Sequence, residues 1–564
     1  MIIFSKNSLL GILMLSTASY SFAQSDLPKG WHLKDKTKDG YQGISLDKAY
    51  DFVKGKKSHT VIVAVIDSGI DTTHEDLKSV LWVNAREIPG NGIDDDKNGY
   101  TDDVNGWNFI GGKDGRNVKE DSYEVARVYH KYKAKFASVT NASTLSNEDK
   151  ELYGMWKKAD KQINGGDKAD GVQLLILRRT YDAVAKNDSI LRKAIGKPIY
   201  TGTELNAFVA TTDDAKKAKN NVLYFFKANN SLEMTNETFI SEFGQYLSGE
   251  ERKAEALEKA PKDYRGEIVK DNEMDYNDKY YGNNDVMANT PFHGTHVAGI
   301  IGAARKNGKG MDGIADNVRI MAIRAVPDGD EHDKDVALAI RYAVDNGAKI
   351  INMSFGKNFS PEKHWVDDAV KYAESKNVLL VHAAGNDGSN IDSVDNFPSG
   401  IYKKDNQAAT TWITVGASGD AKGGGIVAGF SNYGKGTIDV FAPGVKIYSS
   451  VPGGNTYGDA QGTSMASPVV AGTAAFIWSY FPTLTAQQLK NVIEKSAMPV
   501  TVKVTTPGSG KSVLLTDISR TGGVLNAYEA AKLAAQMTGK PPVAQTKTTT
   551  PAKPVKKVKP VKTF

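Results

Sequence analysis

The spacing of apolar positions predicts a sheet whose two faces are both covered. Residues 61–66 form an unbroken apolar run that ends on Asp67, and similar short runs follow at 318–326, 349–353, 378–382, 412–415 and 438–441. Between them, apolar residues recur every three or four positions at 335–344 and 361–374, and a long apolar helix is expected from about 464 to 480. Strands that alternate with helices over short loops favour an α/β fold with a parallel sheet between two helical layers.

The middle of the chain has a different pattern. Val125, Val128, Tyr132 and Phe136 follow a helical spacing, and a second such series follows Ser146, whose Ser-x-x-Asp pattern resembles a capping box. No clear strand pattern occurs between 113 and 283. We therefore expect residues 113–283 to be a large helical insertion within an α/β domain formed by 60–112 and 284–537.

The two ends of the chain are expected to lie outside this domain. Lys6, the apolar stretch 9–15 and the small residues Ser21 and Ala23 before Gln24 are typical of a secretory signal peptide over 1–23. An extension, 24–59, follows it. Residues 538–564 form a Lys/Pro/Thr-rich tail without apolar periodicity, which favours disorder. We expect an exported protein, periplasmic or extracellular, with no membrane span.

Composition and charge narrow the functional classes. The chain has 564 residues and no cysteine, which excludes disulfides, thiolate metal sites and a cysteine nucleophile. The net charge of +5 comes from the end of the tail, because without the six lysines of residues 541–564 and Lys6 of the leader the net charge is −2. The basic pI therefore does not indicate a nucleic-acid partner.

Three polar residues stand out against the apolar pattern. Asp67 ends a buried strand, where a carboxylate is costly unless it is paired. His293 precedes a small-residue helix in F-H-G-T-H-V-A-G, and Ser464 begins the long apolar helix in G-T-S-M-A-S-P. Taken singly, they read as a turn residue, a core histidine and a helix cap. His293-x-x-His296 lacks an obvious third metal ligand, so a metal site there is a weak alternative.

Together the three segments resemble the signatures of the subtilisin-like serine proteases, or subtilases, in that family's Asp, His, Ser order. Further matches lie at 351–356, 383–387, 430–434 and 441–445. The resemblance implies a subtilisin-like α/β catalytic domain in which Asp67 orients His293, and His293 activates Ser464 for attack on a peptide carbonyl. It also implies that Asn386 donates to the oxyanion.

The resemblance assigns two substrate-binding segments as well. Ser354, Phe355 and Gly356 are expected to pair with the extended substrate backbone. Ala383, Ala384 and Gly385 are expected to line the pocket for the residue before the cut. The substrates implied are peptides or proteins, and a monomer is assumed.

The sequence departs from compact subtilases in three places. The insertion separates Asp67 from His293 by 226 positions, and the 36-residue extension is too short for a typical folded propeptide. The third is the loop N-G-I-D-D-D-K-N-G-Y-T-D-D, whose oxygens match EF-hand spacing except at the last position, where Asn105 replaces Glu. A structural Ca²⁺ site is therefore expected, with Asp103 as a supplementary ligand and with the ligand set Asp94, Asp96, Asn98, Tyr100 (through its carbonyl) and Asp102. The alternative is a polar surface turn.

Two rival functions are weighed against a serine endopeptidase. The first is a catalytically weak or inactive scaffold that binds peptides or a partner through the insertion; however, the triad and the oxyanion asparagine are all present. The second is a Ser-His-Asp esterase, which would be expected to carry G-x-S-x-G and a different residue order.

Overall fold

The computed structural model describes residues 27–165, 171–228, 232, 234–256 and 259–539. The predicted signal peptide and nearly all of the predicted tail lie outside these residues. Within the described part of the chain, no helix is long and apolar enough to cross a membrane.

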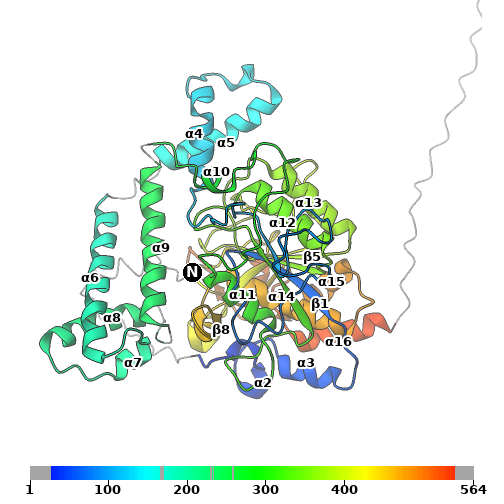
Figure 1. Cartoon of the computed structure of the whole chain (residues 1–564). Helices are drawn as coiled ribbons and strands as arrows, with labels where there is room; N and C mark the ends of the chain where they lie inside the picture. Colours follow the sequence, from blue (N-terminus) through cyan, green and yellow to red (C-terminus); the bar gives the residue numbers. More distant parts are fainter. Residues whose placement is uncertain (1–26, 166–170, 229–231, 233, 257–258, 540–564) are drawn as a thin grey trace, which may run out of the picture.

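A nine-stranded sheet forms the centre of the molecule (Figure 1), in the order β10-β13-β7-β6-β5-β4-β1-β3-β2. All neighbouring strands run parallel except β10 and β13. The strands are β1 (Val61–Asp67), β2 (Gly106–Asn108), β3 (Val318–Arg324), β4 (Ile350–Met353), β5 (Leu379–Ala383), β6 (Trp412–Ser418), β7 (Val440–Pro443), β10 (Met498–Pro499) and β13 (Gly523–Val524). The predicted parallel α/β sheet is confirmed, with small shifts at the strand ends.

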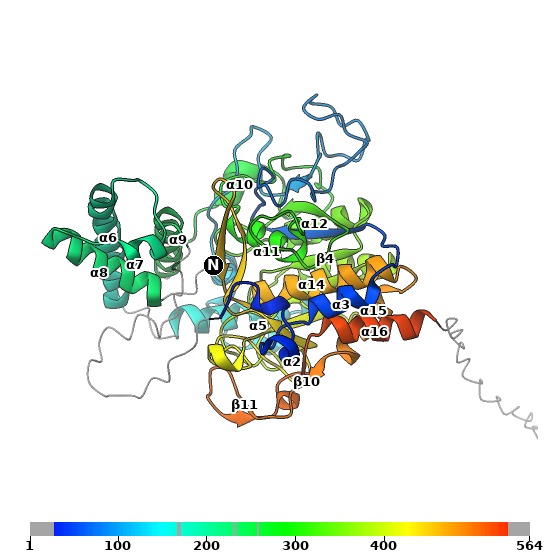
Figure 2. The same ribbon diagram turned by 90° about the horizontal axis from the view of Figure 1, so that it is seen from below.

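The sheet lies between two apolar cores, as the uninterrupted apolar strands predict. In β1, Val63 and Val65 face a core shared with helices on one side, while Ala64 and Ile66 face the other core. The first side carries α11 (Phe292–Gly302), α14 (Thr463–Tyr480), α15 (Ala486–Lys495) and α16 (Ala527–Thr538), and the second carries α12 (Asp333–Asp345) and α13 (Lys363–Ser375). Figure 2 shows α14, α15 and α16 together on one face. The three-layer prediction is confirmed.

The N-terminal extension is packed onto this domain. It contains α2 (Lys36–Asp39) and α3 (Leu46–Val53), and α3 lies beside α16. The Trp31 side chain is fully buried and its Nε1 donates to the carbonyls of Val445 and Lys446. The extension therefore completes the core at the face of the sheet that carries α14.

The segment between β2 and α11 is helical, and it leaves and re-enters the domain at one point. Its helices are α4 (Glu124–Phe136), α5 (Asn147–Asn164), α6 (Gly171–Ile195), α7 (Gly202–Ala207), α8 (Asp213–Ala228), α9 (Asn236–Glu255) and α10 (Tyr264–Val269). The backbones of Asn108 and Asn283 exchange hydrogen bonds of 2.9 and 3.1 Å where the chain departs and returns. This closure keeps the two halves of the sheet in register.

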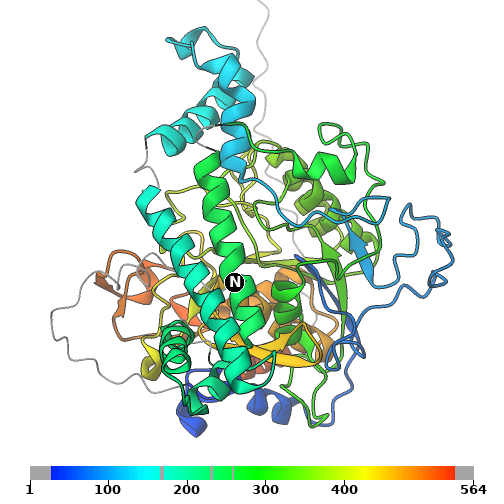
Figure 3. The same cartoon turned by 60° about the vertical axis from the view of Figure 1, so that its left-hand side comes forward.

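The helices of this segment form two groups. One contains α4 and α5, which share an apolar cluster that includes Phe359 of the sheet domain. The other contains α6–α9, whose own apolar cluster reaches Phe292 and Val451. Figure 3 shows both groups beside the sheet domain, with α6 and α9 side by side. Val451 is the last residue of β8 (Ile447–Val451), which forms an antiparallel hairpin with β9 (Thr456–Ala460). A second small hairpin consists of β11 (Val504–Thr505) and β12 (Ser512–Val513).

Candidate active site

The structure brings Asp67 and His293 into direct contact. The Asp67 side chain, 2% exposed at the carboxyl end of β1, accepts hydrogen bonds at Oδ1 from His293 Nδ1 and from the Ser68 amide, both at 2.7 Å. Because a carboxylate oxygen can only accept here, Nδ1 carries a proton, and in the neutral imidazole the free lone pair is then on Nε2. The histidine is therefore held in the tautomer that can take up a proton at Nε2.

Glycine allows the helix with His293 to approach the end of β1 so closely. A Cβ on Gly294 would lie 2.2 Å from the Gly69 carbonyl oxygen and 3.1 Å from the Asp67 Cβ. Gly69 itself has φ +124°, a conformation that favours glycine. The glycines that flank the Asp and His motifs thus serve the contact between them.

Ser464 lies in the first turn of α14, partly exposed, and is tied to the end of β4. Its Oγ donates to the Ser354 carbonyl oxygen at 3.0 Å, and the Ser354 Oγ donates to the Ser464 carbonyl oxygen at 2.9 Å. In this state the serine hydroxyl is thus directed at Ser354 rather than at His293. Catalytic hydrogen bonds often form only when substrate is bound.

The Asn386 amide is oriented by the residue before Ser464. Its Oδ1 accepts hydrogen bonds from the Thr463 amide at 2.9 Å and from the Thr463 Oγ1 at 3.1 Å. Both the Asn386 Nδ2 and the Ser464 backbone nitrogen lie within 3.6 Å of the position that a Cβ on Gly462 would take. Two N–H donors therefore border one small space at the start of α14.

The two predicted substrate segments lie next to each other because β4 and β5 are neighbours. The Phe355 carbonyl accepts from His382 Nε2 at 2.9 Å, and burial lowers the pKa of that histidine to about 4. Gly385 has φ +96° and its amide donates to Thr463 Oγ1 at 3.0 Å. Ala383 and Ala384 are buried at the end of β5.

Arg324 is a positioning residue that the sequence reading missed. It ends β3 beside Asp67, is fully buried, and donates to the carbonyls of Ser68 and Val118 and to side-chain oxygens of Asn108, Asn289 and Thr290. Burial lowers its pKa to about 10. It joins the start and the end of the insertion to the strand that carries Asp67. The signal available in the sequence was an arginine closing the apolar run 320–323.

The predicted calcium loop is folded as a series of tight turns. Oxygens of Asp94 and Asp96 both accept from the Asn98 amide, and the Asn98 Oδ1 accepts from the Tyr100 amide. The Asp102 carboxylate is instead bound by the backbone amides of residues 90–92.

A compact group of carboxylates lies beside this loop. Oxygens of Glu87, Asp96 and Asp103 are all within 4.8 Å of one another, and Glu87 and Asp103 are buried. Burial raises the pKa of Asp103 to about 6. Of these three only Asp96 belongs to the predicted ligand set and Asp103 was expected as a supplement. Glu87 was missed because it precedes the repeating motif.

Comparisons with known proteins agree on one family. A model described as the subtilase family matches residues 58–528. A thermophilic serine proteinase of Bacillus sp. strain AK1 is 43% identical over 188 residues, 33% of this chain and 42% of the relative. Subtilisin DY of Bacillus licheniformis is 39% identical over 207 residues, 36% of this chain and 70% of the relative. The cell wall-associated protease of Bacillus subtilis is 35% identical over 225 residues, 40% of this chain but only 23% of the relative. The chain thus spans less than half the length of the thermophilic proteinase and of the cell wall-associated protease.

Proposed function

The chain belongs to the subtilase family, and we propose that it is an exported serine endopeptidase that cleaves peptides or proteins through Asp67, His293 and Ser464. The observation that carries the proposal is the 2.7 Å contact between Asp67 and His293 at the sheet edge where α14 presents Ser464. Export is proposed from the leader-like residues 1–23.

The reaction follows from these atoms. Rotation of Ser464 Oγ away from the Ser354 carbonyl lets it give its proton to His293 Nε2 and attack the substrate carbonyl carbon. The Asp67 carboxylate stabilises the imidazolium through Nδ1. His293 then protonates the leaving amine, and the C–N bond breaks to leave an acyl-enzyme on Ser464. Water, deprotonated by the same histidine, hydrolyses this ester.

The negative charge of the tetrahedral intermediate needs donors that are already in place. The Asn386 Nδ2 and the Ser464 backbone N–H border the space beside Gly462. Thr463 fixes the Asn386 side chain by donating two hydrogen bonds to its Oδ1. Donors fixed before the reaction stabilise a developing oxyanion without further reorganisation.

We also propose a structural Ca²⁺ at the carboxylate group Glu87, Asp96 and Asp103. Three carboxylates this close, two of them buried, repel one another; Arg86, 2.9 Å from Asp96, offsets part of this charge, and a cation between the three would offset the rest. Hard oxygen donors suit Ca²⁺, and oxygens of Asp94 or Asn98 can complete the coordination. The ion would tie the turn after β1 to the loop before β2 and has no part in the chemistry.

The proposal is tested by labelling with a fluorophosphonate together with a casein digest and an ester substrate. The parent should label and digest casein, whereas Ser464→Ala should do neither while it keeps the parent's melting temperature. Ser389→Ala, on the loop that follows Asn386, is the matched control and should label normally. Absence of labelling in the parent would favour the scaffold alternative, and labelling with ester but no peptide hydrolysis would favour the esterase.

A further inference from the structure

Two chain segments leave the carboxyl edge of the sheet on either side of β1. One follows β3 and contains 328–331, and the other follows β4 and contains Ser354–Gly356, the segment expected to pair with substrate. The outward edges of both are already paired: Asp328 bonds the insertion at 119–121, and Lys357 exchanges hydrogen bonds of 2.8 Å with Phe397. Since bonding direction alternates along an extended chain, Gly356 turns its backbone groups toward the space between the segments. The Glu331 carbonyl oxygen faces the same space, because it accepts a hydrogen bond from the Lys357 side chain of the opposite segment.

The Lys357 side chain spans that space immediately beyond Gly356. Its Nζ donates to the Glu331 carbonyl oxygen on the opposite segment at 2.7 Å, and its side chain is only 2% exposed. It is also paired with Glu124 at 2.8 Å and with Asp333 at 2.9 Å. The segment after β3 and the segment after β4 are thus joined by the buried Lys357 side chain.

The insertion holds this side chain in place. Glu124 begins α4, its amide donates to the Asp330 carboxylate at 2.8 Å, and its side chain pairs with Arg127 at 2.6 Å. Arg127 in turn donates to the carbonyls of Asp330 and Glu331 at 3.1 and 3.2 Å. A buried pair with this many hydrogen bonds is costly to open, because each charge would lose its partners.

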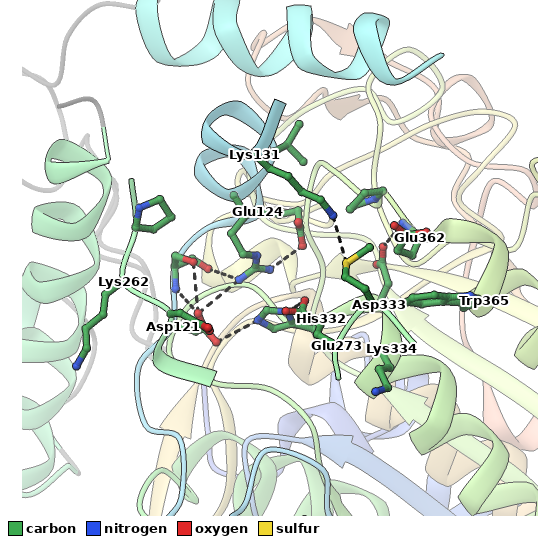
Figure 4. A pocket seen from close by; sticks show the side chains of 17 residues that line it. Asp121, Glu124, Lys131, Lys262, Glu273, His332, Asp333, Lys334, Glu362 and Trp365 are labelled. Atoms are coloured by element: carbon green, nitrogen blue, oxygen red, sulfur yellow. Dashed lines mark hydrogen bonds and ion pairs between the residues drawn. The ribbon is translucent and has the colours of Figure 1, made fainter. Parts of the chain in front are cut away.

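Lys357 forms a barrier together with its partners Glu124 and Asp333. A cavity of about 410 Å³ lies on the side of this barrier away from Ser354–Gly356. Glu124, Arg127 and Asp333 line it. Figure 4 shows Glu124 and Asp333 among the side chains around it, together with Lys131 and Trp365. The layer formed by Lys357, Glu124 and Asp333 therefore separates the cavity from the substrate segment.

Resting on the peptidase function proposed above, we infer that Lys357, fixed by Glu124 of the insertion, closes the upstream end of the peptide cleft. Ala383–Gly385, expected to hold the residue before the cut, lies beside Ser354–Gly356, so the closed end is the end that receives residues before the cut. One strand residue pairs with one partner residue, so about three upstream residues fit along Ser354–Gly356. Residues further upstream must leave the cleft and add no affinity.

The inference is tested by binding, which needs no turnover. Acetylated peptides of two to five residues with free carboxylates, the products of cleavage, are titrated into Ser464→Ala by calorimetry. The Kd should fall about tenfold from two to three residues and change less than about twofold with the fourth and fifth. A tenfold gain from the fourth or fifth residue would show that the cleft is open and overturn the inference.

Two double variants in the same background locate the barrier. Lys357→Ala with Glu124→Ala removes it and joins the cleft to the cavity, so the fourth and fifth residues should then improve the Kd about tenfold. Lys357→Met with Glu124→Gln removes the charges but keeps the volume, and its length profile should stay flat. If the fourth and fifth residues leave the Kd unchanged in both double variants, Lys357 does not close the cleft. Failure of the parent to turn over any peptide, with the expected profile in Ser464→Ala, would count against the peptidase function and not against the closure.

Discussion

Asp67 Oδ1 and His293 Nδ1 lie 2.7 Å apart although 226 positions separate the two residues. The intervening segment does not disturb this contact because it leaves and returns at the Asn108–Asn283 pairing, beside Arg324. The helices extend outward from that point and contact the sheet domain again, through Glu124 of α4 at Lys357 and through α6–α9 at Phe292. The sheet therefore holds the Asp67–His293 contact, and we expect the insertion to influence access to it.

Asn386→Ala should lower kcat by about 10²–10³, the loss known for removing one oxyanion donor from subtilisin, with little change in KM. The reason is that the Nδ2 donor bonds the oxyanion only in the transition state. Initial rates on a peptide p-nitroanilide separate the two constants. An unchanged kcat would exclude Asn386 from the oxyanion site.

Removing calcium should lower the melting temperature. A ligand that binds only the folded state stabilises it by about 2.7 kcal/mol at a hundredfold excess over Kd. Thermal melts in EDTA and in millimolar Ca²⁺ should differ for the parent and coincide for Glu87→Gln with Asp103→Asn. Asp95→Asn is the matched control, since its carboxylate faces the Ile88 amide and Asn91, and it should keep the response. Equal melts of the parent in both solutions would contradict a calcium site.

Three buried histidines should make stability fall on acidification below about pH 6.5, against an opposing contribution from Asp103 and Glu331, whose pKa values burial raises to about 6 and about 8. Burial lowers the pKa of His32 and of His296 to about 3, and that of His382 to about 4. Between these values and 6.5 the unfolded chain binds more protons, so each histidine can cost up to about 1.4 kcal/mol per pH unit as pH falls. Urea unfolding from pH 8 to pH 5 measures the slope.

A substitution of His32 isolates one contribution to that slope. Both of its ring nitrogens are buried and have no partner in the described structure, so His32→Leu should flatten the dependence. His364→Gln, at an exposed histidine, should leave it unchanged. Identical slopes for the parent and His32→Leu would mean that His32 does not titrate in this way.

Arg265→Met should destabilise the protein by about 3–5 kcal/mol, because it leaves Asp271 and Asp335 buried without their shared cation. Arg265 bonds Asp335 at 2.7 and 2.9 Å and Asp271 at 2.5 Å, and all three side chains are at most 1% exposed. Arg178→Met breaks an exposed pair with Glu251 and should cost at most about 1 kcal/mol. Equal losses in urea unfolding would show that Arg265 does not anchor α10 to α12.

Replacing residues 171–255 with a Gly/Ser linker should leave short-peptide cleavage largely unchanged and raise cleavage of folded proteins. These residues carry α6–α9, which pack on Phe292 next to His293, whereas the buried ion pairs of α4 and α10 remain. The ratio of folded-protein to peptide cleavage, with both substrates in parallel, is the readout. A soluble variant with the parent's ratio would show that α6–α9 do not restrict access.

The resemblance to subtilases implied the pairing of Asp67 with His293, whereas the apolar pattern of the sequence by itself determined the sheet and its helical layers. These follow from local patterns: uninterrupted apolar runs mark strands buried on both faces, and parallel strands bring their carboxyl ends to one edge. The glycines around Asp67 and His293 also belong to local motifs. The helical character of 113–283 followed from its 3,4 spacing for the same reason.

Only the tertiary structure decided which charges meet. Arg324, Glu87 and the barrier of Lys357 with Glu124 join segments far apart in the chain, and no local spacing records such pairs. A lysine after Gly356 and a glutamate at the start of α4 each resemble ordinary surface residues in the sequence. They become a buried pair because the insertion returns to the sheet edge, and the low dielectric there makes a separated charge too costly to leave unpaired.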